Sequence, residues 1–523
     1  WEFRDFHGTH KGGTFWTWGR AVPGEDGDRL VVHLKGSNIV LDPELAAALK
    51  PEPELYHAWG TFVPEGHIDF EGTVERPPGQ KPDVDLTVYA KDAAIRPAFF
   101  PLALRAMQGR LHYARRWVEL DNLRARHGDS RLSLERGTIY LKPNGGVWAE
   151  LVGVRGRPLV PDADFVRALP ESLQKACAGL QVRDPVTLST QLVIDSNGEP
   201  GVQPVVYWDG WAALHEATLF AGLRMEHVTG QVACRGRHNG RQLDGVAGNF
   251  ILKRATLLGN NVLEDVRGPF EVAADSPEVL KLPGVFARYG GGEVYGPMRV
   301  EFSPALRYEM KLTASQVRLE DFARMNNLGP DAQLSGLAAG NLYLSGQGND
   351  LKNLRGSGNV VVPEGKMYNL PLLLDLLKVV GLRPPDRTAF EEAEAGFEIT
   401  GPRVHVDHID LIGNAISLRG AGDLNLDGTD INLDFNADWA RVPQMLPASM
   451  RGVPRAISDG LLRIHVSGQL GDVHFAKEPV PALLAPFRRL FGDWWGDGDE
   501  KPAGQAAAPA QPAPVLRSAE PGP

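Results

Sequence analysis

Residues 423–434 have the types and spacing that a calcium-binding loop uses. The run Asp-Leu-Asn-Leu-Asp-Gly begins at Asp423, and Asp434 stands at the twelfth position. In an EF-hand loop, carboxylate and amide oxygens at these positions surround Ca²⁺. The eighth position is Asp430 where an apolar residue is usual, and the twelfth is Asp where Glu is usual. Because the flanks alternate with period two, we expect a β-hairpin around a turn at 426–429 and no metal site.

Two histidines and two aspartates, His405, Asp407, His408 and Asp410, form a second group of possible metal ligands. On a regular β-strand, residues 405 and 408 face opposite sides of the sheet, so they cannot bind one metal ion unless a bulge intervenes. We therefore expect solvated histidines, or histidines at the rim of a groove, and not a metal centre.

Other candidate motifs have simpler structural interpretations. Arg-His-Gly-Asp at 126–129 is interpreted as a turn, and the glutamates near 391–394 as a charged strand entry. We find no nucleophile elbow, Walker loop, metalloprotease helix pair or dinucleotide-binding turn in the sequence. The sequence therefore predicts no catalytic residue, no metal site and no cofactor.

The composition is that of a folded protein with many turns. The chain has 523 residues, of which 43% are hydrophobic and 23% charged, with 59 Gly and 40 Pro. The net charge is −10 and no basic stripe is present, which argues against a nucleic-acid partner. The two cysteines, Cys177 and Cys234, cannot make a disulfide framework or a zinc site by themselves. We expect them to be separate, small, buried residues.

Strand-sized segments recur every 8–12 residues along most of the chain. Examples are GHIDFEGTV from 66, VDLTVYA from 84 and SRLSLERGTIYL from 130. This spacing indicates an all-β array of on the order of 30 strands. Helices interrupt it at 43–49, where Asp42 can cap the first turn, and within 161–180. One continuous sheet of this size cannot close as a small barrel, so its apolar face must be covered by helices, a partner or acyl chains.

The stretch 334–382 combines both patterns. Alternating apolar pairs, Leu342/Leu344 and Val360/Val362, are separated by glycines and predict strands with tight turns. Residues 370–382 are apolar on nearly every side and predict a short helix buried in a core or in lipid. The strongest meander pattern of the chain follows, over 397–439.

Four regions are expected. Residues 1–160 form an N-terminal β-rich region, and 161–290 a middle β-repeat region with a helical interruption. Residues 291–480 form a C-terminal β module that contains the helix 370–382. Residues 481–523 form an amphipathic segment followed by a Pro/Ala-rich tail, which we expect to be disordered.

Residues 312–470 resemble the C-terminal part of the AsmA-like family of bacterial envelope proteins. The residues that carry the resemblance are the strand 340–346, Leu354-x-Gly356-x-Gly358, Gly365 with the leucine-rich helix from Leu370, Phe397-x-Ile399-x-Gly401, Leu418-x-Gly420-x-Gly422-x-Leu424-x-Leu426 and Ile464-x-Val466-x-Gly468. The resemblance covers about a third of the chain, and its specificity lies in the order of short pieces. The first 300 residues match only in rhythm.

The resemblance implies a fold, a location and a function. The fold is mainly β, a long, curved, taco-like antiparallel meander sheet with an apolar groove and a few short helices. The location is the periplasm, with anchoring in the inner membrane through an N-terminal transmembrane segment that would lie outside this chain, which begins at Trp1. The function is binding or transfer of phospholipid, or another acyl lipid, in support of the outer membrane, with a possible envelope protein as partner.

Two other functions stay open. The chain could be a scaffold or assembly factor for outer-membrane proteins that pairs exposed strand edges with its clients. It could also be a β-rich carbohydrate-active enzyme, for which the aromatic residues and the pair Trp208-Asp209 are the only indications.

The candidate site residues follow from the first of these functions. Those expected in the lipid groove are Leu342, Leu344, Val360, Val362, Leu373, Leu377, Ile416, Leu418, Leu424 and Leu426. Those expected at a membrane interface are Leu483, Leu484, Phe487, Leu490, Phe491, Trp494 and Trp495, because Trp and Arg beside Leu and Phe suit the headgroup region. The alternative for the second set is a helix that caps the end of the sheet.

Overall fold

The computed structural model describes most of the chain before residue 480. The described ranges are 1–24, 28–199, 201–220, 224–257, 260–302, 305–325, 335–348, 350–366, 390–413, 416–439, 459–469 and 472–479. The predicted helix 370–382 lies outside them, and so does everything from 480 onward.

The described strands form one antiparallel sheet. The first are β1 (Glu2–His10), β2 (Gly13–Val22), β3 (Arg29–Val40), β4 (Glu65–Arg76), β5 (Asp83–Ile95), β6 (Leu104–Ala114), β7 (Trp117–His127), β8 (Ser130–Leu141), β9 (Val147–Leu159), β10 (Val186–Ser196), β11 (Val205–Phe220), β12 (Arg224–Asn239) and β13 (Leu243–Leu257). The others are β14 (Asn261–Val272), β15 (Val279–Tyr289), β16 (Gly292–Glu301), β17 (Arg307–Arg318), β18 (Ser335–Gln347), β19 (Arg355–Val362), β20 (Gly365–Lys366), β21 (Glu392–Thr400), β22 (Arg403–Ile412), β23 (Ile416–Asn425), β24 (Ile431–Trp439), β25 (Asp459–Gln469) and β26 (Asp472–Pro479).

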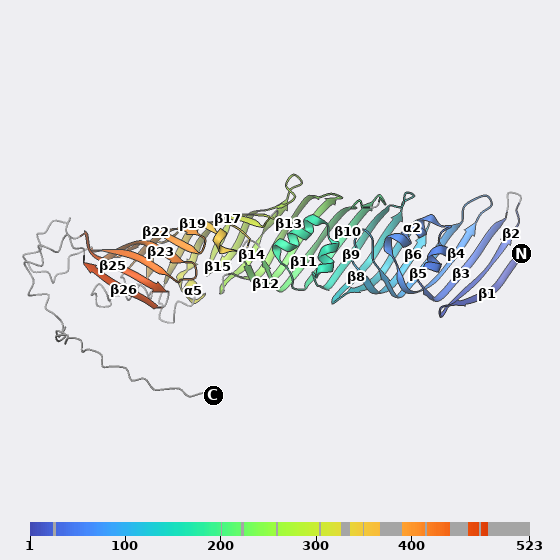
Figure 1. Ribbon diagram of the computed structural model, residues 1–523, viewed down its shortest axis with the longest axis horizontal. Helices are drawn as coiled ribbons and strands as arrows, with labels where there is room; N and C mark the ends of the chain where they lie inside the picture. The colour runs from blue at the N-terminus through green and yellow to red at the C-terminus, as the bar shows by residue number, and fades with distance from the viewer. Residues whose placement is uncertain are drawn as a thin grey trace, which may run out of the picture.

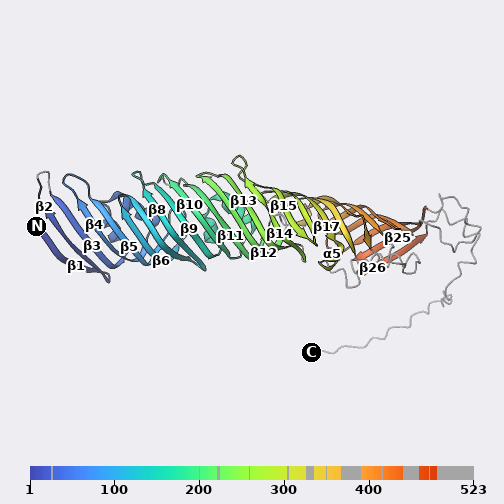
Figure 2. The ribbon, with the colours of Figure 1, turned by 180° about the vertical axis from the view of Figure 1, so that it is seen from behind.

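Each strand pairs with the next strand along the chain, which makes the sheet a meander. The one exception among the described strands is the two-residue β20, which pairs with the start of β18 while β19 pairs directly with β21. Figure 1 shows the strands side by side along the long axis, from β1 at one end to β26 at the other, and Figure 2 shows the same order from behind. With neighbouring strands ~4.8 Å apart, the sheet is on the order of 100 Å long. The predicted mainly β meander with a few short helices is confirmed.

The helices all lie on connections along one long edge of the sheet. They are α1 (Pro43–Ala48), α2 (Pro53–Phe62), α3 (Ala163–Ala168), α4 (Glu171–Leu180) and α5 (Leu319–Met325), with a short 3₁₀ turn, η1 (Leu351–Asn353), elsewhere. In a meander, successive connections alternate between the two edges, so β3–β4, β9–β10 and β17–β18 share one edge. We call this the helix edge. The opposite edge, with connections such as β6–β7, β8–β9 and β14–β15, is the turn edge.

Sequence analysis placed the first two helical interruptions correctly. Residues 43–49 were expected to be helical, and α1 occupies Pro43–Ala48, where Asp42 accepts hydrogen bonds from the backbone N–H groups of Glu44 and Leu45. Residues 161–180 contain α3 and α4, with Asp162 as the cap of α3. The second helix of the first pair, α2, was not predicted. Strand pairing continues across the expected region boundaries at 160 and 290, through β9–β10 and β15–β16.

The register separates an apolar face from a polar face. Directly paired residues of antiparallel strands share a face. One ladder, from β3 to β11, is Leu34, Gly72, Leu86, Tyr113, Val118, Ile139, Ala149, Ile194 and Val206. The adjacent ladder on the opposite face, from β3 to β9, is Lys35, Glu71, Thr87, His112, Glu119, Thr138 and Glu150. Because each register is kept from strand to strand, the apolar face runs along the sheet.

Bulges lie close to the helix edge in several strands. The register shifts beside Asn38 in β3, Ala106 in β6, Glu216 in β11 and Gln316 in β17, and each of these residues has a positive φ. A bulge bends its strand and increases the local twist. A row of bulges along one edge therefore curls the sheet over its own apolar face.

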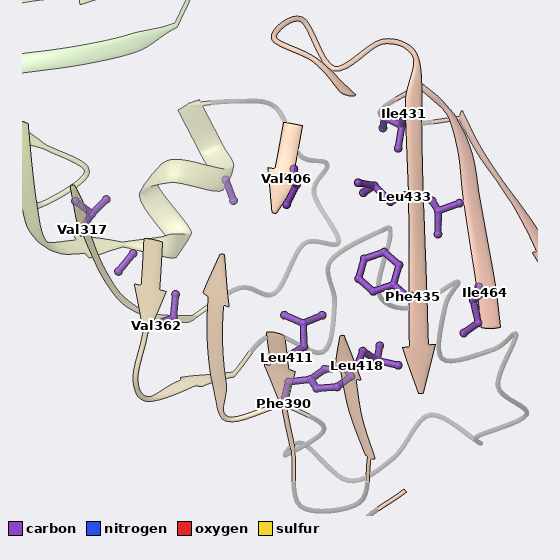
Figure 3. Packing of buried hydrophobic residues seen from close by; sticks show 13 residues of the cluster. Val317, Val362, Phe390, Val406, Leu411, Leu418, Ile431, Leu433, Phe435 and Ile464 are labelled. Atoms are coloured by element: carbon purple, nitrogen blue, oxygen red, sulfur yellow. The ribbon is translucent and has the colours of Figure 1, made fainter. Parts of the chain in front are cut away.

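In the C-terminal part the curl brings the two edges together. Val317 and Leu411 lie near the helix edge, whereas Ile431, Leu433 and Val466 lie near the turn edge, yet all belong to one buried cluster. Figure 3 shows labelled members of this cluster pointing toward one another from separate strands. Leu418, Ile464 and Val466 are each 0% exposed. The apolar face here is a packed core.

Candidate functional site

The candidate site is the apolar face of the strands upstream of this packed core. From β3 to β10, the large aliphatic side chains on this face are mostly half-buried, although they have no outward role in the polar face. The half-buried set is Val32, Leu34, Val84, Leu86, Val88, Leu111, Val118, Leu123, Leu134, Leu151, Val154, Leu188, Leu192 and Ile194. A connected surface of partly exposed aliphatic side chains can bind apolar ligands.

The predicted groove residues within the described strands share this face. The register opposes Leu344 to Gly356 and Ile399, and Leu342 to Gly358 and Phe397. Val360, Val362, Ile416, Leu418 and Leu424 follow the same register on β19 and β23, and nothing is said of the Ile416 side chain. Leu426 lies just beyond the end of β23 and is 43% exposed. Leu373 and Leu377 lie outside the described residues.

These predicted residues differ in how much room is left beside them. Leu344, Val362 and Leu418 are 8%, 4% and 0% exposed and pack within buried clusters, so they face other side chains. Val360 is 40% exposed. The accessible part of the apolar face therefore lies mainly N-terminal to the region in which the sequence pattern placed the site.

The predicted membrane-interface residues cannot be located. Leu483, Leu484, Phe487, Leu490, Phe491, Trp494 and Trp495 all lie outside the described residues. Among the residues that are described, no helix combines the length and the apolar character needed to cross a membrane.

The expectation that His405 and His408 face opposite sides is wrong. The register of β22 shifts between Val406 and Ile409, so one extra residue is inserted and both histidines come to the polar face. His405 Nδ1 lies 3.0 Å from a carboxylate oxygen of Asp423 on the neighbouring strand. This hydrogen bond raises the pKa of His405. The contact is a cross-strand ion pair, which explains the aspartate without a metal ion.

The hairpin expected at 423–434 is confirmed. β23 and β24 pair directly, and the Asp427 side chain accepts hydrogen bonds from the backbone N–H and the hydroxyl of Thr429 in the turn. Asp434, the twelfth residue of the calcium-loop pattern, instead lies 3.0 Å from His465 Nδ1 on β25. The oxygens of this segment are thus engaged in turn and strand contacts.

One group of three possible metal ligands occurs within the described ranges, where His10, Asp42 and Glu44 approach one another. Lys11 Nζ lies 2.6 Å from Asp42 and 3.3 Å from Glu44. The hydrogen bond from Lys11 and that from the backbone N–H of Leu45 lower the pKa of Asp42 to about 2. An ammonium group already neutralises these carboxylates, so the group anchors the start of α1 at the β1–β2 turn.

A cavity of about 570 Å³ lies on the polar face over β10–β14. Gln191, Asp209, Arg235, Ala247 and Glu271 line it and are paired from strand to strand. Tyr207 is also in the lining, but the Arg237 guanidinium lies over its ring at 5.2 Å. The cavity is therefore lined by charges of both signs.

Trp208 and Asp209, the pair that suggested carbohydrate chemistry, point to opposite faces of β11. Trp208 lies over Gly236 on the apolar face, whereas Asp209 lines the polar-face cavity. The two side chains therefore do not share one site.

The two cysteines are separate and free, as expected, but each is half-buried. Cys177 lies on α4 and Cys234 on β12. Burial raises the pKa of both thiols.

Sequence reasoning missed the half-buried residues of β3–β13 as site candidates. Their period-two pattern was recognised, but family resemblance directed attention to residues 312–470. A usable signal was present, because the glycines of the apolar face oppose bulky residues: Phe70 lies against Gly36, and Trp208 against Gly236.

Comparison with known proteins gives no family. The sequence matches no family model, and no curated protein matches it.

Proposed function

We propose that this protein binds acyl lipids on its apolar face and passes them along the sheet, as an AsmA-like envelope protein would. The observation that carries the proposal is the unbroken apolar ladder from Leu34 to Val206, whose leucines stay half-buried. An acyl chain on such a surface gains up to ~0.8 kcal/mol for each methylene removed from water. The setting that fits is the periplasm, between the inner and the outer membrane.

Paired substitutions on the two faces test this proposal. Val88 and Leu111 oppose each other on the apolar face, and their neighbours Thr87 and His112 oppose each other on the polar face. We expect Val88→Asn with Leu111→Asn to weaken binding of a fluorescent phospholipid at least ~10-fold, equivalent to ~1.4 kcal/mol. Thr87→Asn with His112→Asn is the matched control and should bind normally. Equal binding by both variants, or no binding by the delipidated native protein, would reject the proposal.

A second candidate function, scaffolding of other β-proteins, is favoured by one observation. Within the described residues, β1 pairs only with β2, and Trp1 and Phe6 are 77% and 67% exposed. An open edge strand with exposed aromatic residues can accept a strand from another chain. This candidate predicts that a client protein co-purifies without lipid and is lost when proline is introduced into β1.

A further inference from the structure

Two helical connections leave the helix edge, cross the apolar face and reach the turn edge. The first runs through α1 and α2. It starts at Asp42, which is held by Lys11 in the β1–β2 turn of the helix edge. At the start of α2, Glu54 lies 2.7 Å from Arg116, which belongs to the β6–β7 turn of the turn edge. The end of α2 is back at the helix edge, where the Phe62 carbonyl accepts a hydrogen bond from the backbone N–H of Arg96.

The second connection, through α3 and α4, follows the same route further along the sheet. At its start, Asp162 lies 3.2 Å from His127 at the helix edge. On α4, Lys175 lies 3.0 Å from Glu278, in the β14–β15 connection of the turn edge. It returns to the helix edge, where the Asp184 carboxylate accepts a hydrogen bond from the backbone N–H of Thr218 at 2.7 Å.

Both connections rest on the apolar face. Leu55 and Ala58 of α2 pack against the cluster that contains Tyr113, Ile139 and Val147. The Cα of Gly179 on α4 approaches Phe302 so closely that an added Cβ would lie 2.7 Å from its ring. In Figure 1 the helices lie across the strands near β6 and near β10–β11, at two separate places along the sheet. We call these two connections the straps.

A strap obstructs a lipid more than it obstructs a hydrocarbon chain. Acyl tails on the apolar face leave the charged headgroup in the water between the two edges of the sheet, because burying a charge is costly. Each strap occupies that opening from one edge to the other. A headgroup that moves along the sheet must therefore pass through the place that the strap occupies.

We propose that the two straps are gates for phospholipid headgroups, and that passage along the sheet requires their turn-edge ends to detach. This inference rests on the proposed lipid function and adds its regulation. The attachments suit reversible opening. The Glu54–Arg116 and Lys175–Glu278 pairs are part-exposed, with side chains 17% and 36%, and 40% and 40%, exposed. Ion pairs with that much exposure to water are weak.

Reversible cross-linking of the turn-edge ends tests the gates. In a Cys177→Ser, Cys234→Ala background, Glu54→Cys with Arg116→Cys and Lys175→Cys with Glu278→Cys are joined by a short bis-maleimide that contains a disulfide. Binding of a fluorescent phosphatidylethanolamine and its transfer between donor and acceptor vesicles are then measured. We expect binding to be unchanged, and transfer to fall at least ~10-fold and recover when the linker is reduced.

A cross-link elsewhere controls for the chemistry. Arg110 and Asp121 form a 3.3 Å ion pair between β6 and β7 on the polar face, so Arg110→Cys with Asp121→Cys places the same linker away from both straps. This protein should transfer lipid at the native rate. A complementary variant, Glu54→Gln with Lys175→Met, removes both attachments and should transfer faster than the native protein.

The outcomes separate the two proposals. Unlinked protein that binds no lipid overturns the proposed function, and the gates with it. Protein that binds lipid and transfers it at an unchanged rate when both straps are cross-linked overturns the gates alone.

Discussion

At the scale of single residues, the apolar face depends on glycines that leave room for large neighbours. A Cβ added to Gly420 would lie 2.5 Å from the ring of Phe435, which is 3% exposed and belongs to the C-terminal core. The ring lies where a side chain at 420 would otherwise stand. Alternating small and bulky residues across strands thus lets the sheet curl without voids.

Gly420→Ala is expected to destabilise the protein by ~1–3 kcal/mol, because the core around Phe435 cannot take an extra methyl group without displacing the ring. Gly8→Ala on β1 is the matched control, since an added Cβ there meets nothing within 4 Å. It should change stability by no more than ~0.5 kcal/mol. Urea unfolding measures both, and equal effects would show that the close approach at Gly420 carries no energetic weight.

The Asp42 carboxyl is expected to titrate near 2, because Lys11 and the N–H of Leu45 hydrogen-bond to its charged form. Since this folded-state pKa lies below the ordinary value of 3.8, its stabilising contribution is present above pH 3.8 and is lost as the pH falls toward 2. Lys11→Met should move the pKa upward. Carboxyl ¹³C NMR follows the titration, and an unchanged midpoint in the variant would contradict the role assigned to Lys11.

At the scale of elements, the ends of the strap helices combine good and poor local choices. α1 begins with an Asp cap followed by Pro43, both favourable at a helix start. α2 ends at Val63, whose φ is 45° and ψ is 63°, the left-handed conformation that a β-branched residue adopts with difficulty. Val63 is 48% exposed, so packing does not explain its presence.

Val63→Gly is expected to stabilise the protein by ~1 kcal/mol, because glycine adopts the left-handed conformation without the penalty of a Cβ. Val22→Gly provides the comparison, since Val22 is 50% exposed but ends a strand with ordinary φ. That variant should lose ~0.5–1 kcal/mol. Thermal unfolding gives both values, and the same sign for the two variants would contradict the strain at Val63.

The elements also show where sequence reasoning succeeds and fails. Period-two alternation with glycine-rich turns identified the meander, and caps such as Asp42 identified the first helix, because both signals are local. The bulge between Val406 and Ile409 was missed and reversed the face of His408. A bulge depends on the register of two strands, and single-strand periodicity carries no record of it. The route of α2 and α4 across the sheet likewise depends on contacts with residues ~60–100 positions away, such as Glu54 with Arg116 and Lys175 with Glu278.

At the scale of the whole molecule, each strand contacts mainly its two neighbours, as in a repeat protein. Stability in such a sheet is set locally. The C-terminal core joins both edges through Leu418, Ile464 and Val466, whereas the ladders of β3–β10 retain half-buried side chains. The two ends of the sheet therefore differ in how much apolar surface they bury, and the less buried end is the part available to a ligand.

Hydrogen–deuterium exchange should reveal this gradient. We expect amides of β22–β25 to exchange at least ~10-fold more slowly than those of β1–β3, because local opening is least favourable where strands join a buried core. Added phospholipid should slow exchange in β3–β13, where the apolar face is half-buried, and leave β22–β25 unchanged, because a bound ligand stabilises only the segments that open to release it. Uniform exchange along the sheet would contradict local stability, and lipid protection confined to β22–β25 would place the site in the C-terminal core.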